Sequence, residues 1–441
     1  MYKRLKDSIN IDSLDIDINY LNNIENILKD KDYNVSLVTY KNKLLDIKEK
    51  DEFNNVFGLA IDIGTTTIAM YIMNLVTGEE VDVVSQVNKQ RNYGADIISR
   101  INFTIENNEG LSILQRCIAN QLNEMIQILC ENNDIKYENI YNAVIAGNTT
   151  IIHLLLGLSC KNIAIAPYIP ITTEEINIHA DELNINININ GIITIMPGIA
   201  SYVGSDITAG IISSNLINSD RYSLLLDLGT NGEMLVGNNN KIVSCSTAAG
   251  PAFEGANIKY GIGGVKGAIC KVDLSKNKIY ESIGNNSPIG ICCSGVLDSV
   301  AHLLKYNIID ETGKLYDKDN INNGRLKVNL VNNNQKEFIL AQSDDKEFIS
   351  RRQRDIREVQ LAKAAIRAGI NILLDEANLQ LDDIEYLYIE GGFGNFMNVE
   401  SCLKIGMIPK ELQGKIISIG NCAGLGAKKY LLSQNIRTVA N

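Results

Sequence analysis

Apolar runs that end in a glycine turn are the clearest pattern in this sequence. The run FGLAIDIG at 57–64 is followed by the β-branched run TTTIAMYIMNL, which predicts two strands joined at Gly64. The segment RYSLLLDLGTNGEMLVGN at 221–238 repeats this pattern, and it places Asp227 165 residues after Asp62. We interpret the two segments as copies produced by an internal duplication.

Helical periodicity and further strands complete the repeated pattern. Apolar residues recur at spacings of three and four between Leu111 and Leu129, and a second such stripe runs from Asp355 to about Leu374. Both stripes predict amphipathic helices. The segments AVIAGN at 143–148 and YLYIE at 386–390 predict strands that each enter a glycine turn.

Three stretches differ from this pattern. Strict alternation in NINININGIITIM at 184–196 favours a strand, although its Asn-Ile pairs also fit a low-complexity loop. The polar stretch 308–350 is interpreted as a surface excursion. Residues 1–57 are rich in Asn, Asp, Lys and Ile, with one predicted helix around Leu21–Leu28 and a strand-like VSLVTY, and we expect them to form a small appendage.

Composition and charge narrow the class of protein. Lys and Arg number 41 and Asp and Glu number 52, for a net charge of −11. No basic stripe of the kind that neutralises a phosphate backbone is evident, so we expect no nucleic-acid partner. Apolar residues make up 45% of the chain, yet no run approaches the roughly 18 residues of a membrane span. The chain also opens without an apolar signal core, and we expect a cytoplasmic protein without a membrane partner.

Cysteine and histidine positions argue against a zinc or iron–sulfur centre within one chain. The nine cysteines show no C-x2-C pair and no close trio. This spacing is not typical of a disulfide scaffold, a structural zinc site or an iron–sulfur cluster. His153 and His302 lie in apolar helical contexts, and we interpret both as core histidines.

The two Asp-x-Gly-Thr turns predict phosphate binding. Glycine allows close backbone approach, while N–H groups and threonine hydroxyls face an anion. A carboxylate at the end of the first strand can hold hydrated Mg²⁺, which takes only one or two protein carboxylates beside phosphate oxygens. Either turn alone also fits an ordinary hairpin, but two at duplicated positions favour a nucleotide. We therefore expect Asp62 and Asp227 to bind the metal, within a nucleotide-binding set of Asp62, Gly64, Thr65, Thr66, Thr67, Asp227, Gly229, Thr230, Asn231, Gly391, Gly392, Gly394 and Asn395.

This set of turns resembles the superfamily of acetate and sugar kinases, heat-shock chaperones and actin. Within it, longer blocks are similar to the reductive activators of corrinoid proteins, and the similarity spans about 58–433. The blocks are QVNKQRNYGADIISRI at 86–101, AGNTTIIHLLLGL at 146–158, DLGTNGEMLVGN at 227–238, STAAGPAFEGANIKYG at 246–261, DIREVQLAKAAIRAGI at 355–370 and EGGFGN at 390–395.

The resemblance implies an α/β fold with two ribonuclease-H-like lobes and ATP in the cleft between them. It implies lobes at 58–220 and 221–441, with residues 1–57 similar to the end of a linking domain. The implied activity is ATP-dependent reduction of Co(II) to Co(I) in a corrinoid protein, with ATP and Mg²⁺ as cofactors and a homodimer as the assembly. For hydrolysis, Asp206 in GSDIT and Glu233 in GTNGE are the candidates for orienting the attacking water.

Two departures from the family pattern bear on the electron-transfer step. Members typically carry a ferredoxin-like iron–sulfur domain, which is not found in this sequence, so we expect a separate ferredoxin-type donor. Cys293 and Cys422 stand where the family has small residues. Two alternatives stay open, namely a dehydratase-type activator whose dimer bridges an iron–sulfur cluster and a small-molecule kinase of the same fold.

Overall fold

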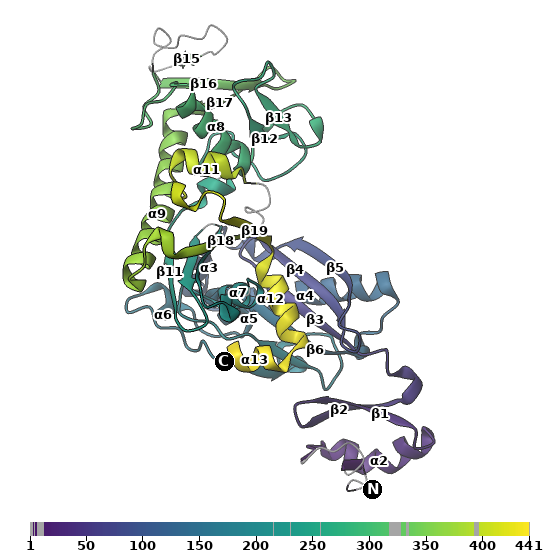
Figure 1. The fold of residues 1–441 in the computed structure, drawn as a ribbon. Coiled ribbons are helices and arrows are strands. Elements are labelled where there is room, and N and C mark those ends of the chain that lie inside the picture. The colour runs from purple at the N-terminus through teal and green to yellow at the C-terminus, as the bar shows by residue number, and fades with distance from the viewer. Residues whose placement is uncertain are drawn as a thin grey trace. The chain divides into compact units, whose positions relative to one another are not determined.

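The chain forms two compact units. The computed structural model describes residues 3, 5–6, 13–214, 216–229, 231–255, 257–316, 328–331, 335–391 and 397–440. Unit 1 consists of Met1–Ser213 together with Ala423–Asn441, and unit 2 consists of Ser214–Cys422. Figure 1 labels the elements of each unit along the chain.

Unit 1 is built on a six-stranded mixed sheet with the strand order β5-β4-β3-β6-β8-β7. The central strand β3 runs antiparallel to β4 and parallel to β6. The sequence-predicted strand pair and the strand at 143–148 are thereby confirmed. The six strands are β3 (Phe57–Ile63), β4 (Thr67–Asn74), β5 (Glu80–Val87), β6 (Ile140–Gly147), β7 (Ile176–His179) and β8 (Ile192–Ile195).

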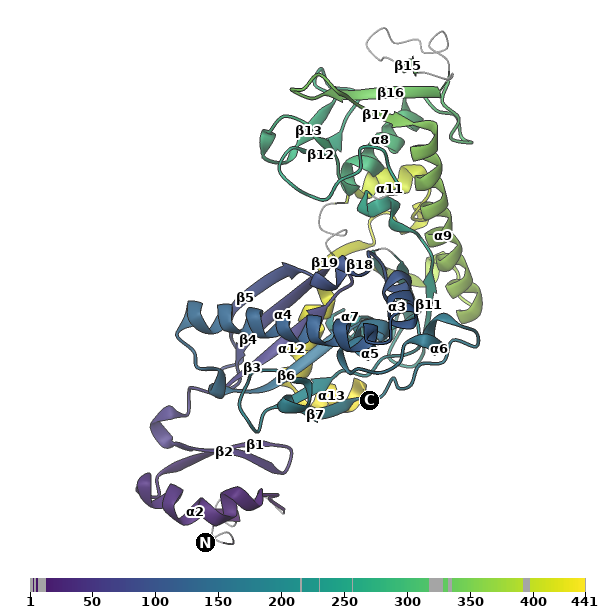
Figure 2. The same ribbon diagram turned by 180° about the vertical axis from the view of Figure 1, so that it is seen from behind.

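Helices cover both faces of this sheet. They are α3 (Ile97–Glu106), α4 (Gly110–Asn133), α5 (Thr149–Leu155), α6 (Lys161–Ala164), α7 (Ser205–Ser213), α12 (Cys422–Leu432) and α13 (Gln434–Ala440). On one face, α4 and α5 pack in a cluster with Leu59 and Ile61 of β3. On the other face, Ala209 of α7 and Tyr430 of α12 pack in a cluster with Ala60. Figures 1 and 2 show α12 and α4 on these opposite faces. Because β3 is covered on both sides, its residues are apolar except for Asp62.

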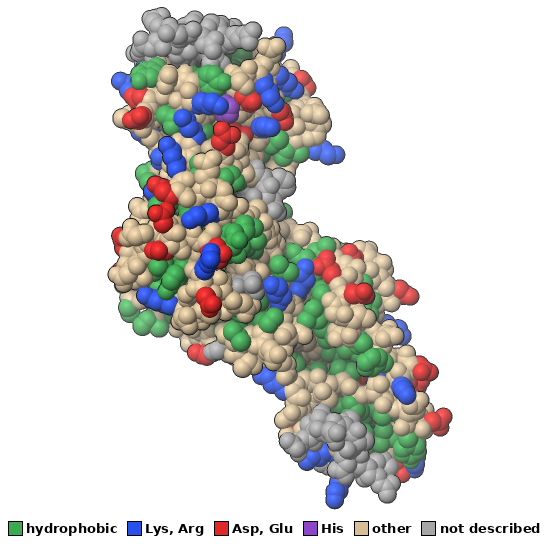
Figure 3. All heavy atoms as spheres, viewed as in Figure 1, with side chains coloured by type: hydrophobic (Ala, Val, Ile, Leu, Met, Phe, Trp, Pro, Cys, Tyr) green, Lys and Arg blue, Asp and Glu red, His purple; other side chains and the backbone are tan. Residues whose placement is uncertain are grey.

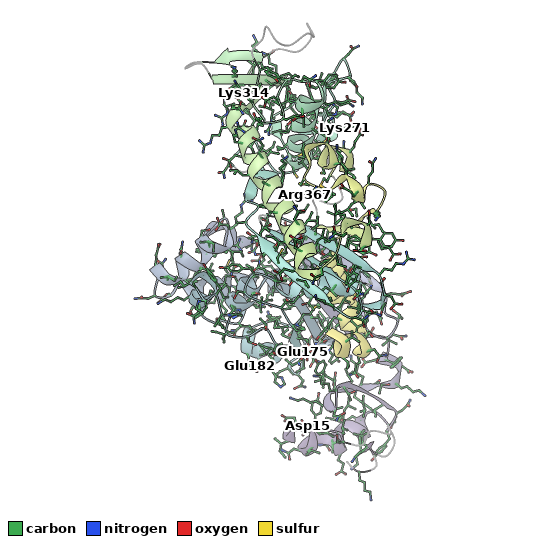
Figure 4. All side chains as sticks on the ribbon, turned by 60° about the vertical axis from the view of Figure 1, so that its left-hand side comes forward. Asp15, Glu175, Glu182, Lys271, Lys314 and Arg367 are labelled. Carbon is green, nitrogen blue, oxygen red and sulfur yellow. The ribbon has the colours of Figure 1, made fainter. Side chains whose placement is uncertain are left out.

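A small N-terminal layer packs within unit 1. It consists of helix α2 (Ile18–Asp30) and a hairpin of β1 (Val35–Tyr40) and β2 (Lys43–Glu49), and Figure 4 labels Asp15 within it. Tyr141 donates its hydroxyl to Asp46 at 2.5 Å. Arg437 of α13 donates to the hydroxyl of Tyr40 and to Oδ1 of Asn142, each at 2.9 Å. The layer is therefore tied to both the sheet and the C-terminal helix.

The last residues of the chain belong to unit 1, whereas the sequence placed all of 221–441 in the second lobe. Ala427, Tyr430 and Leu431 are buried in the cluster on the α7 face of the sheet. Tyr430 also donates its hydroxyl at 2.5 Å to Glu175, which Figure 4 labels. The apolar face of α12 packs against the sheet of unit 1. The segment from Ala423 onward is therefore part of unit 1 rather than of the second lobe.

Unit 2 repeats the sheet of unit 1 in five strands, with the order β11-β10-β9-β18-β19. Here too the first strand, β9, runs antiparallel to its neighbour β10 and parallel to β18. The strands are β9 (Tyr222–Leu228), β10 (Gly232–Gly237), β11 (Ile242–Thr247), β18 (Ile384–Glu390) and β19 (Ile416–Gly420). The same order in both units confirms the duplication and the α/β fold class expected from the sequence.

Further elements enlarge unit 2. Two small sheets contain β12 (Ala268–Val272), β13 (Tyr280–Ser282), β14 (Gly290–Ile291), β15 (Val328–Val331), β16 (Gln335–Gln342) and β17 (Phe348–Arg352). The helices are α8 (Cys293–Lys305), α9 (Gln353–Ala377) and α11 (Val399–Ile405). Ile356, Ile366 and Ile370 of α9 are fully buried in the unit 2 core. The helical stripe predicted for this segment is confirmed, and α4 likewise confirms the stripe at 111–129.

Two sequence predictions about irregular segments are wrong in part. Of the stretch 184–196, only β8 is a strand, while Ile185 and Ile187 are buried in a loop that Asn184 enters with a φ of 55°. The alternation at 184–187 reflects the burial of Ile185 and Ile187 rather than hydrogen bonding to a neighbouring strand. The segment 308–350 is not merely a surface excursion, because Ile308, Phe338 and other apolar residues in it join the unit 2 core.

Surface and covalent features agree with a globular chain. On the face drawn in Figure 3, Lys and Arg side chains stand among acidic and polar ones rather than in a continuous basic stripe. Among the described residues, no helix has the length and apolarity that a membrane span requires. All nine cysteines lie in the described part of the chain, and none forms a disulfide.

Candidate phosphate-binding site

The carboxyl ends of two parallel strands meet at the predicted turn of unit 1. In the pairing of β3 with β6, Asp62 lies opposite Ala146. Asn148 follows β6 and caps α5, because its Oδ1 accepts the N–H of Ile151 at 3.0 Å. The Nδ2 of Asn148 donates to Oγ1 of Thr65 at 3.1 Å. The start of α5 is thus fastened to the turn that follows Asp62, at the edge of the sheet where α/β proteins commonly bind ligands.

The start of α7 joins the same place. Ser205 donates its hydroxyl to the carbonyl of Gly147 at 2.9 Å and accepts the Gly147 N–H at 3.0 Å. The backbone of Gly204 approaches so closely that an added Cβ would lie 2.5 Å from Cα of Asn148. Only glycine fits there. Asp206 is therefore held in the first turn of α7, directly after the residue that is bonded to Gly147.

Burial raises the pKa of the Asp206 carboxyl to about 6. Hydrogen bonds from the backbone N–H groups of Ile207, Asp206 and Gly204 oppose this shift but do not cancel it. The bond from Ile207 reaches Oδ1 at 2.9 Å. A carboxyl group with a pKa in this range changes its protonation state near neutral pH, which suits a residue that orients or deprotonates water.

The turn at Gly64–Thr67 is braced from one side. The backbone N–H of Gly64 donates to the carbonyl of Thr67 at 3.0 Å, and this hydrogen bond closes the turn. Nδ2 of Asn88 donates to the carbonyl of Gly64 at 2.9 Å, and the backbone N–H of Asn88 donates to the carbonyl of Thr66 at 2.9 Å. Arg100 donates to the carbonyl of Thr65 at 2.6 Å. The three successive carbonyl groups of the turn are therefore all engaged.

In unit 2, the predicted aspartate lies in a row of carboxylates. Asp227 of β9 is opposite Glu233 of β10 and opposite Glu390 of β18. Directly opposed residues on neighbouring strands share one face of a sheet, with Cβ atoms about 5 Å apart. The positions that correspond in unit 1 are occupied by Ala69 and Ala146. The duplicated frame thus carries one carboxylate in unit 1 and three in unit 2.

A hydroxyl donor and a glycine turn lie beside this row of carboxylates. Ser246 of β11 donates its hydroxyl to Glu233 at 3.5 Å. Gly391 follows Glu390 with a φ of 82°, a left-handed conformation that favours glycine, and an added Cβ would lie 3.2 Å from Oδ1 of Asp227. The N–H of Gly229 donates to the carbonyl of Asn231 at 3.0 Å. Of the predicted residues, Thr230, Gly392, Gly394 and Asn395 lie outside the described residues.

Unit 1 also contains an open depression of about 510 Å³, lined in part by Lys89, Arg116 and Glu124. A cavity of about 20 Å³ in unit 1, lined in part by Thr149, His153 and Ser205, has room for about one water molecule. His153 is fully buried, and its two ring nitrogens contact the carbonyl of Thr149 and the N–H of Ile171. This confirms it as a core histidine. Within the described parts of the chain, no group of three or more His, Cys, Asp or Glu residues is arranged to hold a metal ion.

Sequence reasoning missed the residues that brace these turns. Asn148 could have been found, because Asn followed by Thr-Thr-Ile after a strand is a helix N-cap pattern. Asn88, Arg100, Ser205 and Glu390 carry no such local signal. Each acquires its place only when segments distant in the chain come together.

Comparisons with known proteins match both units of the chain. The family described as the C-terminal domain of RACo, the ASKHA domain, matches residues 221–441, and the RACo middle region matches residues 57–219. The corrinoid activation enzyme RamQ of Eubacterium limosum is 36% identical over 407 residues, covering 91% of this chain and 68% of that protein. The [Co(II) methylated amine-specific corrinoid protein] reductase of Methanosarcina barkeri is 24% identical over 417 residues, covering 86% and 71%.

A solved structure is similar over nearly the whole chain. The structure of a reductive activator for corrinoid, iron–sulfur protein matches with a TM-score of 0.83 and 36% sequence identity. The match covers 97% of this chain and 69% of that one.

Proposed function

Because the chain belongs to the RACo family, whose members include reductive activators of corrinoid proteins, we propose that it is an ATP-dependent activating enzyme for a corrinoid protein. The observation that carries this proposal is the repeated sheet, which places Asp62 and Asp227 at equivalent positions in the two units. This duplicated frame is that of the ASKHA ATPases, and the chain binds ATP as a member of that class.

We assign the nucleotide contacts to the two turns. In unit 1 these are Gly64, Thr65, Thr66 and Thr67, and in unit 2 they are Gly229, Thr230 and Asn231. Backbone N–H groups and hydroxyls in such turns suit phosphate oxygens. The turn after β18, with Gly391, Gly392, Gly394 and Asn395, is assigned to the base and ribose.

The donor chemistry of the two aspartates fits Mg²⁺. Mg²⁺ prefers oxygen ligands and retains several waters, so one or two carboxylates are enough. In unit 2, the carboxylates of Glu233 and Glu390 flank Asp227, and neighbouring negative charges favour a bound cation or proton. We therefore propose Asp62 and Asp227 as the residues that hold the metal, directly or through its waters. When bound, Mg²⁺ would neutralise charge on the phosphates.

Hydrolysis requires a water oriented toward the terminal phosphate. We propose Asp206 and Glu233 for this role. Asp206 has the better support, because its first-turn position on α7 is fixed against Asn148 and because its pKa of about 6 suits proton transfer. Glu233 is supported by its place beside Asp227 and by the hydroxyl of Ser246.

The reaction couples two balanced steps. One electron from a donor converts Co(II) to Co(I) in the partner, while ATP and water give ADP and phosphate. The reduction is uphill, since about 59 mV of one-electron mismatch costs a factor of ten in equilibrium. Nucleotide binding shifts this equilibrium only through different affinities of the ATP and ADP states for the partner. We propose a separate ferredoxin-type donor, a homodimeric activator and a cytoplasmic location.

The test follows Co(II) loss from a purified corrinoid protein by absorbance. Dithionite-reduced ferredoxin supplies electrons, and ATP is added or omitted. We expect Co(I) to form at a useful rate only when ATP, activator and donor are all present. An ATP-independent rate, together with ATP-dependent phosphorylation of a small-molecule acceptor, would instead establish the kinase alternative.

A further inference from the structure

Arg100 is a buried cation whose partners are all neutral. It lies on α3, visible in Figure 2, and its side chain has no exposed surface. Its guanidinium donates from Nε to the carbonyl of Gly94 at 3.0 Å, from Nη1 to Oε1 of Gln90 at 3.4 Å and from Nη2 to the carbonyl of Thr65 at 2.6 Å. Within the described residues, Arg100 forms no ion pair with a carboxylate.

Burying an arginine without a counter-charge is costly, so its retention calls for an explanation. Burial lowers the pKa of Arg100 to about 10, and the more distant Asp96 offsets part of this shift. The side chain nevertheless remains protonated at neutral pH. A full positive charge therefore lies enclosed in unit 1, directly behind the Gly64–Thr67 turn.

The geometry of the Gly64–Thr67 turn indicates where a negatively charged group would lie opposite Arg100. In a planar trans peptide, the carbonyl of one residue and the N–H of the next point in opposite directions. Because Asn88 and Arg100 engage the carbonyls of Gly64, Thr65 and Thr66, the N–H groups of Thr65, Thr66 and Thr67 point away from them. In the described structure, the N–H groups of Thr65 and Thr66 donate to no protein acceptor.

We propose that Arg100 is a positioning residue that makes this turn selective for highly charged phosphate groups. It orients the Thr65 peptide through its hydrogen bond and adds the field of a poorly screened cation behind the N–H groups of Thr65 and Thr66. An anion in front of the turn then supplies the counter-charge. The inference rests on the proposed function, since it assumes that a nucleotide phosphate binds at this turn.

Two substitutions separate charge from shape. Arg100→Gln removes the charge and keeps a polar side chain, whereas Arg100→Lys keeps the charge and loses the planar fork. Arg116→Gln, at an exposed position of α4, removes the same charge from unit 1 and is the matched control. Affinities of the purified protein for ATP, ADP and adenosine are measured by titration calorimetry at fixed Mg²⁺ and ionic strength.

We expect Arg100→Gln to weaken ATP binding by about 10-fold to 100-fold, ADP binding by less and adenosine binding hardly at all. Arg100→Lys should keep the ratio of ATP to ADP affinity within about threefold of the wild type. Equal loss for all three ligands, or no loss in a folded Arg100→Gln protein, would overturn the inference. If Arg100→Gln does not fold, the Arg100→Lys ratio decides, and its collapse would likewise overturn it.

These outcomes are distinct from failure of the proposed function. A wild-type protein that binds no ATP would contradict the nucleotide assignment itself. A wild-type protein that binds ATP, with Arg100 variants that discriminate phosphates normally, would contradict only the role of Arg100.

Discussion

The raised pKa of Asp206 predicts how stability and activity change with pH. In the unfolded chain this carboxyl titrates near its ordinary value of 3.8, whereas in the folded chain burial raises its pKa to about 6. Above pH 6 the group is charged in both states, and the folded state bears the whole cost of keeping a charge in a poorly hydrated place. Below pH 4 it is neutral in both states, and no cost remains.

The size of the pKa shift of Asp206 determines how strongly the free energy of unfolding depends on pH. A difference of about two pKa units corresponds to about 3 kcal/mol, which is an upper limit because the side chain keeps some contact with water. By proton linkage, about 0.8 kcal/mol of this change in the free energy of unfolding occurs between pH 8 and pH 5.5. We therefore expect the free energy of unfolding of Asp206→Asn, minus that of the wild type, to increase by about 0.8 kcal/mol over this range as the pH rises.

The measurement is urea unfolding followed by circular dichroism, at pH values above the isoelectric point near 5.0. ATP hydrolysis is measured on the same samples. If Asp206 orients water as a carboxylate, the wild-type rate should fall as pH drops through about 6, and Asp206→Asn should hydrolyse ATP slowly at every pH. A stability difference that is constant with pH, or that changes in the opposite direction, would refute the burial argument.

Other perturbations test the remaining parts of the site. Asp62→Asn and Asp227→Asn should each lower Mg–ATP affinity or turnover by at least about tenfold without changing the circular dichroism spectrum, and unchanged turnover in both would contradict the metal assignment. Gly204→Ala should destabilise unit 1 by about 1–3 kcal/mol and weaken ATP binding, because its methyl group would meet the backbone of the α5 start. Gly198→Ala is its control, since an added Cβ there meets nothing closer than 3.5 Å, and equal effects would show that crowding is not the cause. Arg437→Met should speed hydrogen exchange in the β1–β2 hairpin, because it loses the bond to Tyr40, and unaltered exchange would show that the hairpin is held by other contacts.

Local signals were enough to predict the strands and the positions of Asp62 and Asp227 near the ends of two of them. An apolar run, a glycine turn and a second apolar run are read from consecutive residues, and both Asp62 and Asp227 end such runs. The same holds for α4 and α9, whose stripes repeat over many turns. In each case the determining contacts lie within one element or between neighbours in sequence.

The braces of the turns depend on contacts across the chain and could not be predicted in this way. Arg100 reaches Thr65 across 35 residues, and Ser205 reaches Gly147 across 58 residues. The prediction of a strand at 184–196 failed in part for a related reason. Ile185 and Ile187 alternate with polar residues because they are buried in the core of unit 1, and not because they pair with another strand. Periodicity reports which side chains are buried, but it does not report what buries them.

The return of the C-terminal segment to unit 1 has a consequence for synthesis on the ribosome. Unit 2 occupies a continuous segment, Ser214–Cys422, whereas unit 1 needs α12 to cover one face of its sheet. At about 5–20 residues per second, the earlier segment of unit 1 must wait until all of unit 2 has been made before it can bury that face. The unit that begins first in the chain is therefore the last to be completed, and one face of its sheet stays uncovered by α12 until then.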